Sequence, residues 1–308
     1  MAAVSILRPG MFTTVQDLGR WGFQSRGVPV SGAMDWYSHR LANRLLGNDA
    51  SMATLEVTLT GPRVRFETGA AFAVTGAEFQ LTLDEAPVEM NQPVEAGPGA
   101  VLMFGERLRG ARAYIALAGG IDVPEILGSR STHVLTGMGG FEGRALKTGD
   151  RIGIGVRGKG RGATTPQPFP LTPHPLPLAP SPFTARLRVI PDDGRLMTHI
   201  TSQRFRVSPR SDRMGYRLEG EGIGTLPGEI VSTAVPTGAI QVPPTGQPIL
   251  LMNDHATTGG YAIAGTVITA DLPAAGQLAP GDWIEFEACS IDIANEELRQ
   301  REAALGIA

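Results

Sequence analysis

Apolar residues occur along this chain in short runs that end at Gly, Pro, Asn or Asp. Short runs with these boundaries are typical of strands in β-barrels and β-sandwiches rather than of βαβ units. We therefore predict a mainly β protein with few helices. The predicted strands are residues 64–66, 72–74, 79–83, 101–104 and 113–117, followed by 187–190, 204–207, 249–252, 267–270 and 283–286.

Helical periodicity is confined to two segments. Residues 31–46 place apolar side chains on one face, with Ser31 as the predicted N-cap and Gly47 as the stop. A second, charged helix is predicted near the C-terminus, over residues 292–305.

A change in composition divides the chain into two parts. A glycine-rich stretch after Gly158 passes into a run of prolines that extends from Pro166 to Pro182. Such a run favours an extended backbone that neither a helix nor the interior of a sheet accommodates. We predict a first β domain over residues 1–160, a linker over 161–184, and a second β domain with the C-terminal helix over 185–308.

A short stretch recurs near the end of each predicted domain. Residues 146–154 and 278–286 both contain a Gly-Asp turn that leads into a predicted strand. The recurrence suggests two copies of a related β domain.

Composition and charge exclude several classes of protein. With 42% apolar residues, 19% charged residues and a net charge of −3, the chain has material for a core and no general attraction to nucleic acid. Its single cysteine, Cys289, excludes an intramolecular disulfide framework and a cysteine-rich metal site. The start resembles no secretory signal, and no 18-residue apolar run occurs, so we expect a cytoplasmic protein without membrane contact.

Motifs for common chemistries are incomplete. Residues 153–160 match a glycine-rich phosphate loop, but Gly160 replaces the Ser or Thr that would hold magnesium, and prolines replace the following helix. The five histidines show no metal-ligand spacing, so no metal site is predicted. The only lysines, Lys147 and Lys159, lack the flanking methionines of a biotin attachment site, so we expect no covalently bound cofactor.

Five polar, glycine-rich clusters remain as candidates for a binding or catalytic site. Arginine side chains bind carboxylates in a bidentate manner, and glycines let backbone N–H groups approach an anion. For any single cluster, however, the pattern favours a structural role, in which Arg–Asp pairs and turns fix the corners of β domains. The clusters are residues 13–20, 31–35, 128–132, 211–217 and 253–261.

At these clusters the sequence resembles the biotin-dependent carboxyltransferase-like family. That family includes allophanate hydrolase subunit 2, the C-type subunit of 5-oxoprolinase and the sporulation regulator KipA. The similarity extends from Pro9 to Phe286 and rests on several ordered motifs, among them Thr14–Arg20, Ser31–Asp35, Gly128–Thr132, Ser211–Leu218 and Thr258–Tyr261.

The resemblance implies two tandem cyclophilin-like β-barrel domains and a partner protein, the B-type subunit, which is similar to allophanate hydrolase subunit 1. It also implies one of two activities: ATP-dependent opening of 5-oxoproline to glutamate, or carboxyl transfer to urea. We expect the C-type subunit of a 5-oxoprolinase, a hydrolase active only in its complex, with ATP as a possible ligand of that complex. The alternatives are a carboxyltransferase component and a KipA-like protein that sequesters a kinase inhibitor.

Candidate roles follow from residue chemistry within these motifs. Asp254 or Tyr261 would move a proton as the catalytic group. Backbone amides at Gly259 and Gly260 would stabilise a developing oxyanion. The remaining candidates, predicted to bind the substrate, are Arg130, Arg213, Gln241 and Thr258.

One motif departs from the family pattern. Ala256, Ala262 and Ile263 stand where relatives often carry Gln, Pro and a basic residue. The missing cation weakens the case for carboxyl transfer by this chain, because a carboxylate-like species would lack its charge partner.

Overall fold

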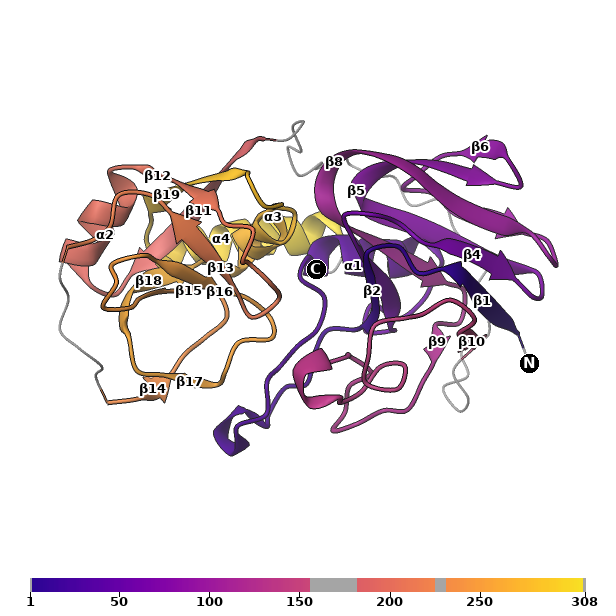
Figure 1. The fold of residues 1–308 in the computed structure, drawn as a ribbon, viewed down its shortest axis with the longest axis horizontal. Helices are drawn as coiled ribbons and strands as arrows, with labels where there is room; N and C mark the ends of the chain where they lie inside the picture. Colours follow the sequence, from indigo (N-terminus) through magenta and orange to yellow (C-terminus); the bar gives the residue numbers. More distant parts are fainter. Residues whose placement is uncertain (1, 156–181, 225–230, 307–308) are drawn as a thin grey trace. The chain divides into compact units, whose positions relative to one another are not determined.

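A computed structural model describes residues 2–155, 182–224 and 231–306, and every structural statement below concerns these residues (Figure 1). They form two compact units. The first contains residues 2–20 and 31–155, and the second contains residues 21–30 together with the described residues from 182 onward. Most of the predicted linker, 161–184, lies outside the described residues, so the predicted domain boundaries stay a prediction.

The first unit is built on a ten-stranded antiparallel sheet that approaches a closed barrel. Seven strands follow the order β2-β3-β8-β4-β1-β10-β9, and β5 pairs with β6, β7 and β8. The strands are β1 (Ala3–Arg8), β2 (Phe12–Gln16), β3 (Thr54–Thr58), β4 (Arg63–Phe66), β5 (Ala70–Leu83), β6 (Ala86–Val88), β7 (Val94–Ala96), β8 (Val101–Leu117), β9 (Ile121–Asp122) and β10 (Arg151–Ile154). The 3-10 helix η2 (Val134–Thr136) also lies in the first unit, whereas η1 (Gln24–Arg26) belongs to the second.

Two long strands join segments that the sequence presents separately. Predicted strands 72–74 and 79–83 both belong to β5, and 101–104 and 113–117 both belong to β8. The β5–β8 register shifts three times between Gly76 and Leu81. Such bulges bend a strand without ending it, so the polar stretches within β5 and β8 are bends and not turns.

Helix α1 (Trp36–Leu45) covers part of this sheet, where Ala42 and Leu45 pack against Tyr114. The helix begins later than predicted. Asp35 is the N-cap, since its carboxylate accepts hydrogen bonds from the backbone N–H and the hydroxyl of Ser38 at 2.9 and 2.6 Å. The predicted N-cap, Ser31, lies in a buried loop with φ +57°, so that part of the prediction is wrong.

The second unit contains a closed seven-stranded barrel with strand order β11-β18-β15-β16-β13-β12-β19. Strands β11 and β19 pair in parallel, and the other neighbours are antiparallel. The barrel strands are β11 (Thr184–Pro191), β12 (Arg204–Val207), β13 (Gly215–Glu219), β15 (Ala239–Val242), β16 (Ile249–Leu251), β18 (Ala262–Val267) and β19 (Trp283–Ala288). A separate two-stranded ribbon consists of β14 (Thr233–Ala234) and β17 (Thr258–Gly259).

Short helices accompany this barrel: α2 (Gly194–Thr201), η3 (Thr269–Asp271), α3 (Leu272–Gly276) and α4 (Ile291–Ala304). The predicted C-terminal helix is confirmed as α4. The predicted strand 267–270 is wrong, because β18 ends at Val267 and the chain turns into η3. Asp271 explains the turn, since its buried carboxylate accepts hydrogen bonds from Arg188 Nε and Nη2 at 2.9 and 2.7 Å. The mainly β fold with few helices is otherwise confirmed.

The recurring Gly-Asp turns have the same geometry in both units. Asp150 accepts a hydrogen bond from the Lys147 amide at 2.7 Å, and Asp282 accepts one from the Ala279 amide at 2.8 Å. The glycine before each aspartate has a positive φ, with values of +94° and +97°. Each turn leads into a strand, β10 or β19, which supports the predicted kinship of the two units.

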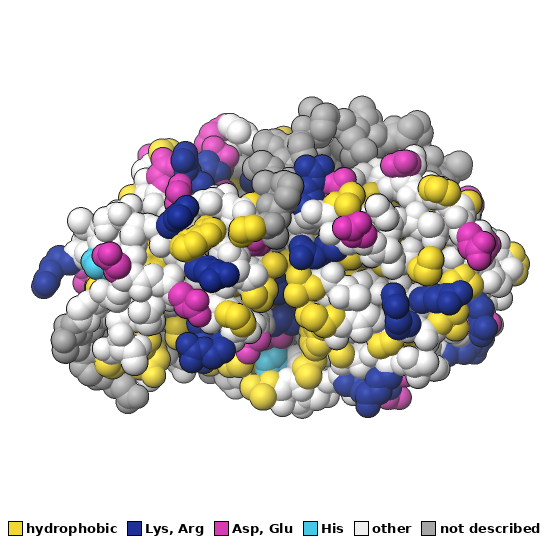
Figure 2. Space-filling view, turned by 45° about the horizontal axis from the view of Figure 1, so that its top comes forward, with side chains coloured by type: hydrophobic (Ala, Val, Ile, Leu, Met, Phe, Trp, Pro, Cys, Tyr) yellow, Lys and Arg dark blue, Asp and Glu magenta, His cyan; other side chains and the backbone are white. Residues whose placement is uncertain are grey.

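None of the described helices is long and apolar enough to cross a membrane. On the face shown in Figure 2, Lys and Arg side chains lie among acidic and hydrophobic ones and form no continuous basic surface among the residues drawn.

The Asp282 turn should contribute measurably to stability. This carboxylate is 1% exposed and also accepts from the Phe183 amide at 3.1 Å. Replacing Asp282 by Ala would leave two buried N–H groups without acceptors, so we expect the free energy of unfolding to fall by roughly 2 kcal/mol. Urea denaturation measures this change. The control is Asp122→Ala, an exposed aspartate, and an equal loss in both variants would contradict the assignment.

His39 on α1 is completely buried, and its Nδ1 lies 2.9 Å from the Thr54 hydroxyl. Burial lowers the pKa of His39 from 6.5 to about 4, against the opposing effect of the Asp17 and Glu56 carboxylates. The folded protein therefore keeps the imidazole neutral at a pH where the unfolded chain protonates it.

This difference predicts a pH dependence of stability. Between pH 6.5 and about 4, the unfolded chain binds one proton that the folded chain excludes. The neutral His39 therefore imposes no cost on stability above pH 6.5. As the pH falls to 4, we expect the free energy of unfolding to decrease by about 3 kcal/mol. His39→Asn should make the free energy of unfolding depend less steeply on pH, by an amount equivalent to the uptake of up to one proton on unfolding. An unchanged slope in that variant would disprove the effect.

Candidate functional site

Side chains alternate between two faces along β13, β15 and β16. Tyr216, Ile240 and Leu250 are at most 2% exposed and fill the interior of the barrel. Their sequence neighbours on each strand point to the outer face. There Val235, which directly follows β14, packs with Ala239 and Leu251 in a small apolar cluster.

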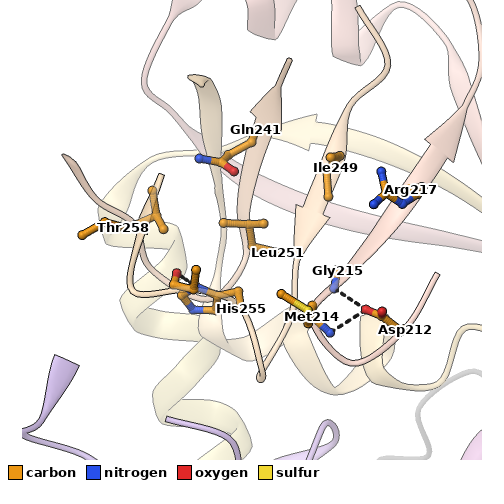
Figure 3. A pocket seen from close by; sticks show the side chains of 11 residues that line it. Asp212, Met214, Gly215, Arg217, Gln241, Ile249, Leu251, His255 and Thr258 are labelled. Atoms are coloured by element: carbon orange, nitrogen blue, oxygen red, sulfur yellow. Dashed lines mark hydrogen bonds between the residues drawn. The ribbon is translucent and has the colours of Figure 1, made fainter. Parts of the chain in front are cut away.

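A pocket of about 220 Å³ lies on this outer face (Figure 3). Its walls come from β13, β15, β16, the β14–β17 ribbon and the loop between β16 and β17. The residues that line it are Asp212, Met214, Gly215, Arg217, Val235, Gln241, Ile249, Leu251, His255, Ala256 and Thr258.

The register of three strands places an arginine, an isoleucine and a glutamine in one row. Arg217 lies opposite Ile249, and Ile249 lies opposite Gln241. Because neighbouring strands are about 4.8 Å apart, the α-carbons of Arg217 and Gln241 are separated by about 10 Å. The Arg217 residue is exposed, and its guanidinium makes no ion pair with any described residue. The row thus has a cationic end, an apolar middle and an amide end.

Gln241 forms the amide end of the row and is 6% exposed. Its Nε2 atom is buried without a hydrogen-bond acceptor among the described residues. A Cβ atom at position 259 would lie 2.1 Å from this nitrogen, so any larger residue there would displace the Gln241 amide. Figure 3 shows the amide directed toward Thr258 and away from Ile249.

His255 supplies a neutral imidazole at the opposite wall. Its Nδ1 lies 2.6 Å from the Ala256 carbonyl, and its Nε2 lies 3.1 Å from the Thr237 hydroxyl. Since a carbonyl only accepts, Nδ1 carries the proton and Nε2 accepts from Thr237. Burial lowers the pKa of His255, which outweighs the opposing effects of the Ala256 carbonyl and Asp254. The imidazole therefore adds no positive charge to the pocket at neutral pH.

Asp212 fixes the edge of the pocket where β13 begins. Its Oδ1 accepts hydrogen bonds from the amides of Met214 and Gly215 at 2.8 and 3.3 Å, as Figure 3 shows. This Asx-type turn sets the direction of β13 and hence the position of Arg217.

Two predicted site residues, Arg213 and Asp254, form a buried ion pair with each other. Arg213 Nε and Nη2 donate to the Asp254 carboxylate at 2.9 and 3.2 Å. The Asp254 amide also donates to the Arg213 carbonyl at 2.9 Å. These contacts tie the loop that carries His255 to the start of β13. Neither residue lines the pocket, and their predicted substrate-binding and catalytic roles stay predictions.

The other predicted residues are divided between the two units. Thr258 and Gln241 line the pocket, Gly259 contacts Gln241, and Gly260 and Tyr261 follow β17 as half-buried residues outside the lining set. Arg130 lies in the first unit, while the other seven lie in the second.

In the first unit Arg130 belongs to a corner centred on Asp17. Asp17 accepts hydrogen bonds from the amides of Gly19 and Arg130 and from the hydroxyls of Ser129 and Ser131. The Arg130 guanidinium contacts the Val123 carbonyl and, at 3.0 Å, Glu125. The clusters 13–20 and 128–132 therefore meet in space, as a hydrogen-bonded corner.

Arg217 and His255 were not among the predicted site residues, although both lie within predicted clusters. The signal for Arg217 was its position between Tyr216 and Leu218, because a polar residue between two buried ones faces out of a barrel. No such pattern marks His255, because it lies in a loop, and only the structure shows that this loop places it in the pocket wall. Among the described residues, no three His, Cys, Asp or Glu side chains are grouped so that they could hold a metal ion.

Two β units, one of them a closed barrel with a small pocket on its outer face, define a tandem β-barrel protein. Residues 26–288 match the family model described as carboxyltransferase domain, subdomain A and B, and the chain belongs to this family. The resemblance stated from the sequence motifs is confirmed.

Relatives fall into two groups. The chain is 39% identical over 306 residues to the C-type subunit of Escherichia coli 5-oxoprolinase, covering 97% of this chain and 94% of that protein. It is 35% identical to urea amidolyase of Lachancea kluyveri, covering 98% of this chain but 18% of that protein. The crystal structure of Kluyveromyces lactis urea carboxylase superposes with a TM-score of 0.92 at 33% identity, covering 98% of this chain and 29% of that one.

The Arg213–Asp254 pair can be tested by a double-mutant cycle. Arg213→Met should lower the free energy of unfolding by about 3 kcal/mol, because it leaves the Asp254 charge buried and unpaired. Adding Asp254→Leu should restore part of that loss. The control is Arg186→Met, whose 3.7 Å ion pair with Glu285 is exposed and should contribute less than about 1 kcal/mol. Strictly additive losses in the double variant would argue against a coupled pair.

Proposed function

We propose that this chain is the C-type subunit of an ATP-dependent 5-oxoprolinase, which opens 5-oxoproline to glutamate. The main support for this proposal is the 39% sequence identity to the C-type subunit of Escherichia coli 5-oxoprolinase, which extends over 94% of that protein. A second protein of the same name, from Haemophilus influenzae, is 35% identical over 96% of its length.

The proposed partner is the B-type subunit, an allophanate hydrolase subunit 1-like protein, and activity requires the complex. Hydrolysis of the lactam breaks the bond between the ring nitrogen and the carbonyl carbon and adds water across it. Coupled hydrolysis of ATP to ADP and phosphate drives the reaction. ATP is a ligand of the complex in this proposal, and the chain carries no covalent biotin.

The pocket of the second barrel suits this substrate. Its volume of about 220 Å³ accommodates a small lactam, and its walls combine apolar side chains with few polar groups. Gly259 and Gly260 remain the proposed donors to a developing oxyanion, with Tyr261 or Asp254 as the proposed proton carrier.

Carboxyl transfer to an amide such as urea is the second candidate. The TM-score of 0.92 to a urea carboxylase favours it. Ile263, where a cation is often found in relatives, speaks against it, because a carboxylated intermediate would lack a charge partner.

Reconstitution distinguishes these functions. We expect the chain mixed with its B-type partner to form glutamate from 5-oxoproline with matching ATP consumption, whereas each protein alone forms none. A parallel reaction receives urea, bicarbonate and a carboxybiotin donor. Turnover only in that reaction would favour carboxyl transfer. A stable complex without turnover of either substrate would contradict the proposal and favour a regulatory role.

A further inference from the structure

The side-chain amide nitrogen of Gln241, Nε2, is a buried hydrogen-bond donor without an acceptor among the described residues. A buried N–H group without an acceptor is unfavourable, and most such groups in folded proteins find a partner. Protein atoms do not supply one among the described residues, and Gly259, which has no side chain, lies beside this nitrogen. An acceptor brought by a ligand in the adjoining pocket would satisfy this nitrogen.

The opposite end of the row carries the complementary charge. Arg217 lines the same pocket, and its guanidinium makes no ion pair with a described residue. Of the other titratable lining groups, His255 is held by Ala256 and Thr237, and Asp212 accepts from two backbone amides at the edge. Arg217 is therefore the group placed to receive an anion, and a guanidinium matches a carboxylate in shape and hydrogen bonding.

We propose that the row Arg217–Ile249–Gln241 binds a small monoanionic amide. Its carbonyl oxygen accepts a hydrogen bond from Gln241 Nε2, its carboxylate pairs with Arg217, and its apolar carbons lie on Ile249. This deepens the proposed function and rests on it for the natural ligand, because 5-oxoproline carries both a lactam carbonyl and a carboxylate.

The geometry suits one such molecule. Arg217 on β13 and Gln241 on β15 are separated by strand β16, so their α-carbons are about 10 Å apart. The Gln241 amide points toward Thr258 and away from Ile249 in Figure 3, so its side chain must rotate before Gln241 and Arg217 can both contact a compact ligand that lies over Ile249. Arg217 is also the only Lys or Arg among the described residues that line the pocket, so the ligand's single carboxylate has one cation to pair with.

Ligands that each lack one group allow the two contacts to be tested separately. 5-Oxoproline has both the carbonyl and the carboxylate, 2-pyrrolidinone has only the lactam carbonyl, and proline has the carboxylate without the lactam carbonyl. The variants are Gln241→Met, which removes the donor at similar size, and Arg217→Gln, which removes the charge. Arg210→Gln, at an exposed arginine of the same unit that does not line the pocket, is the control.

Dissociation constants are measured by calorimetry and ligand-observed NMR on the full chain in complex with its B-type partner. We expect each pocket variant to weaken 5-oxoproline binding at least about tenfold. For 2-pyrrolidinone, Gln241→Met should weaken binding and Arg217→Gln should leave it within about twofold, since the effect of Arg217 requires a carboxylate. Proline should bind more weakly than 5-oxoproline, and the control should match the wild type.

Several results would overturn the inference. They are wild-type affinity for 5-oxoproline in both variants, a loss of 2-pyrrolidinone binding in Arg217→Gln equal to that in Gln241→Met, and no binding of 5-oxoproline at all. If Gln241→Met unfolds, Gln241→Glu keeps the side-chain shape without the donor and is expected to weaken 5-oxoproline binding in the same way.

The same measurements separate this inference from the proposed function. Turnover of 5-oxoproline with an unchanged KM in both variants would refute the row as the binding site and leave the function standing. Specific lactam binding through Gln241 and Arg217 without turnover would support the row and refute the function.

Discussion

In a closed barrel each strand residue faces either the filled interior or the outside, and in the second unit this division decides where chemistry can occur. Tyr216, Ile240 and Leu250 are buried in the interior and contribute to its packed core. The outward residues between them must be solvated or covered by another part of the chain. The β14–β17 ribbon contributes to that cover, and a pocket lies between the ribbon and the barrel wall.

Short acidic side chains fix the corners on which this arrangement depends. Asp150, Asp282 and Asp212 each accept hydrogen bonds from backbone amides at a turn that precedes a strand. Asp17 does the same for two distant segments of the first unit, and Asp35 begins α1. A carboxylate that accepts N–H donors at a turn sets the local backbone direction, and at Asp282 and Asp35 a lost bond would also leave a buried donor unpaired. Positions of site residues such as Arg217 therefore follow from turn chemistry a few positions away.

The same scaffold is found in relatives named for two different activities, 5-oxoprolinase and urea amidolyase. A shared fold does not decide between them, since function depends on the groups that a site presents. In this chain the pocket presents one amide, one guanidinium, a neutral imidazole and, at its edge, the Asp212 carboxylate. In the proposed function this set would recognise a small carbonyl compound with one negative charge, and the partner protein would supply the remaining chemistry in the complex.

The sequence by itself determined the class of fold, the family and the strands with clear apolar runs. These features depend on hydrophobic patterns and motifs formed by residues that are close together in the sequence. It also named Gln241 and Thr258, which line the pocket, and their predicted role in substrate binding stays a prediction. It could not show that two pairs of predicted strands are single bent strands, or that residues 267–270 turn into η3, since bulges and the Arg188–Asp271 pair depend on distant partners. Only the tertiary structure decided that Arg213 and Asp254 bind each other, and that Arg217 lies in a row with Gln241. Strand register and burial, which arise when segments far apart in the chain pair, set both outcomes.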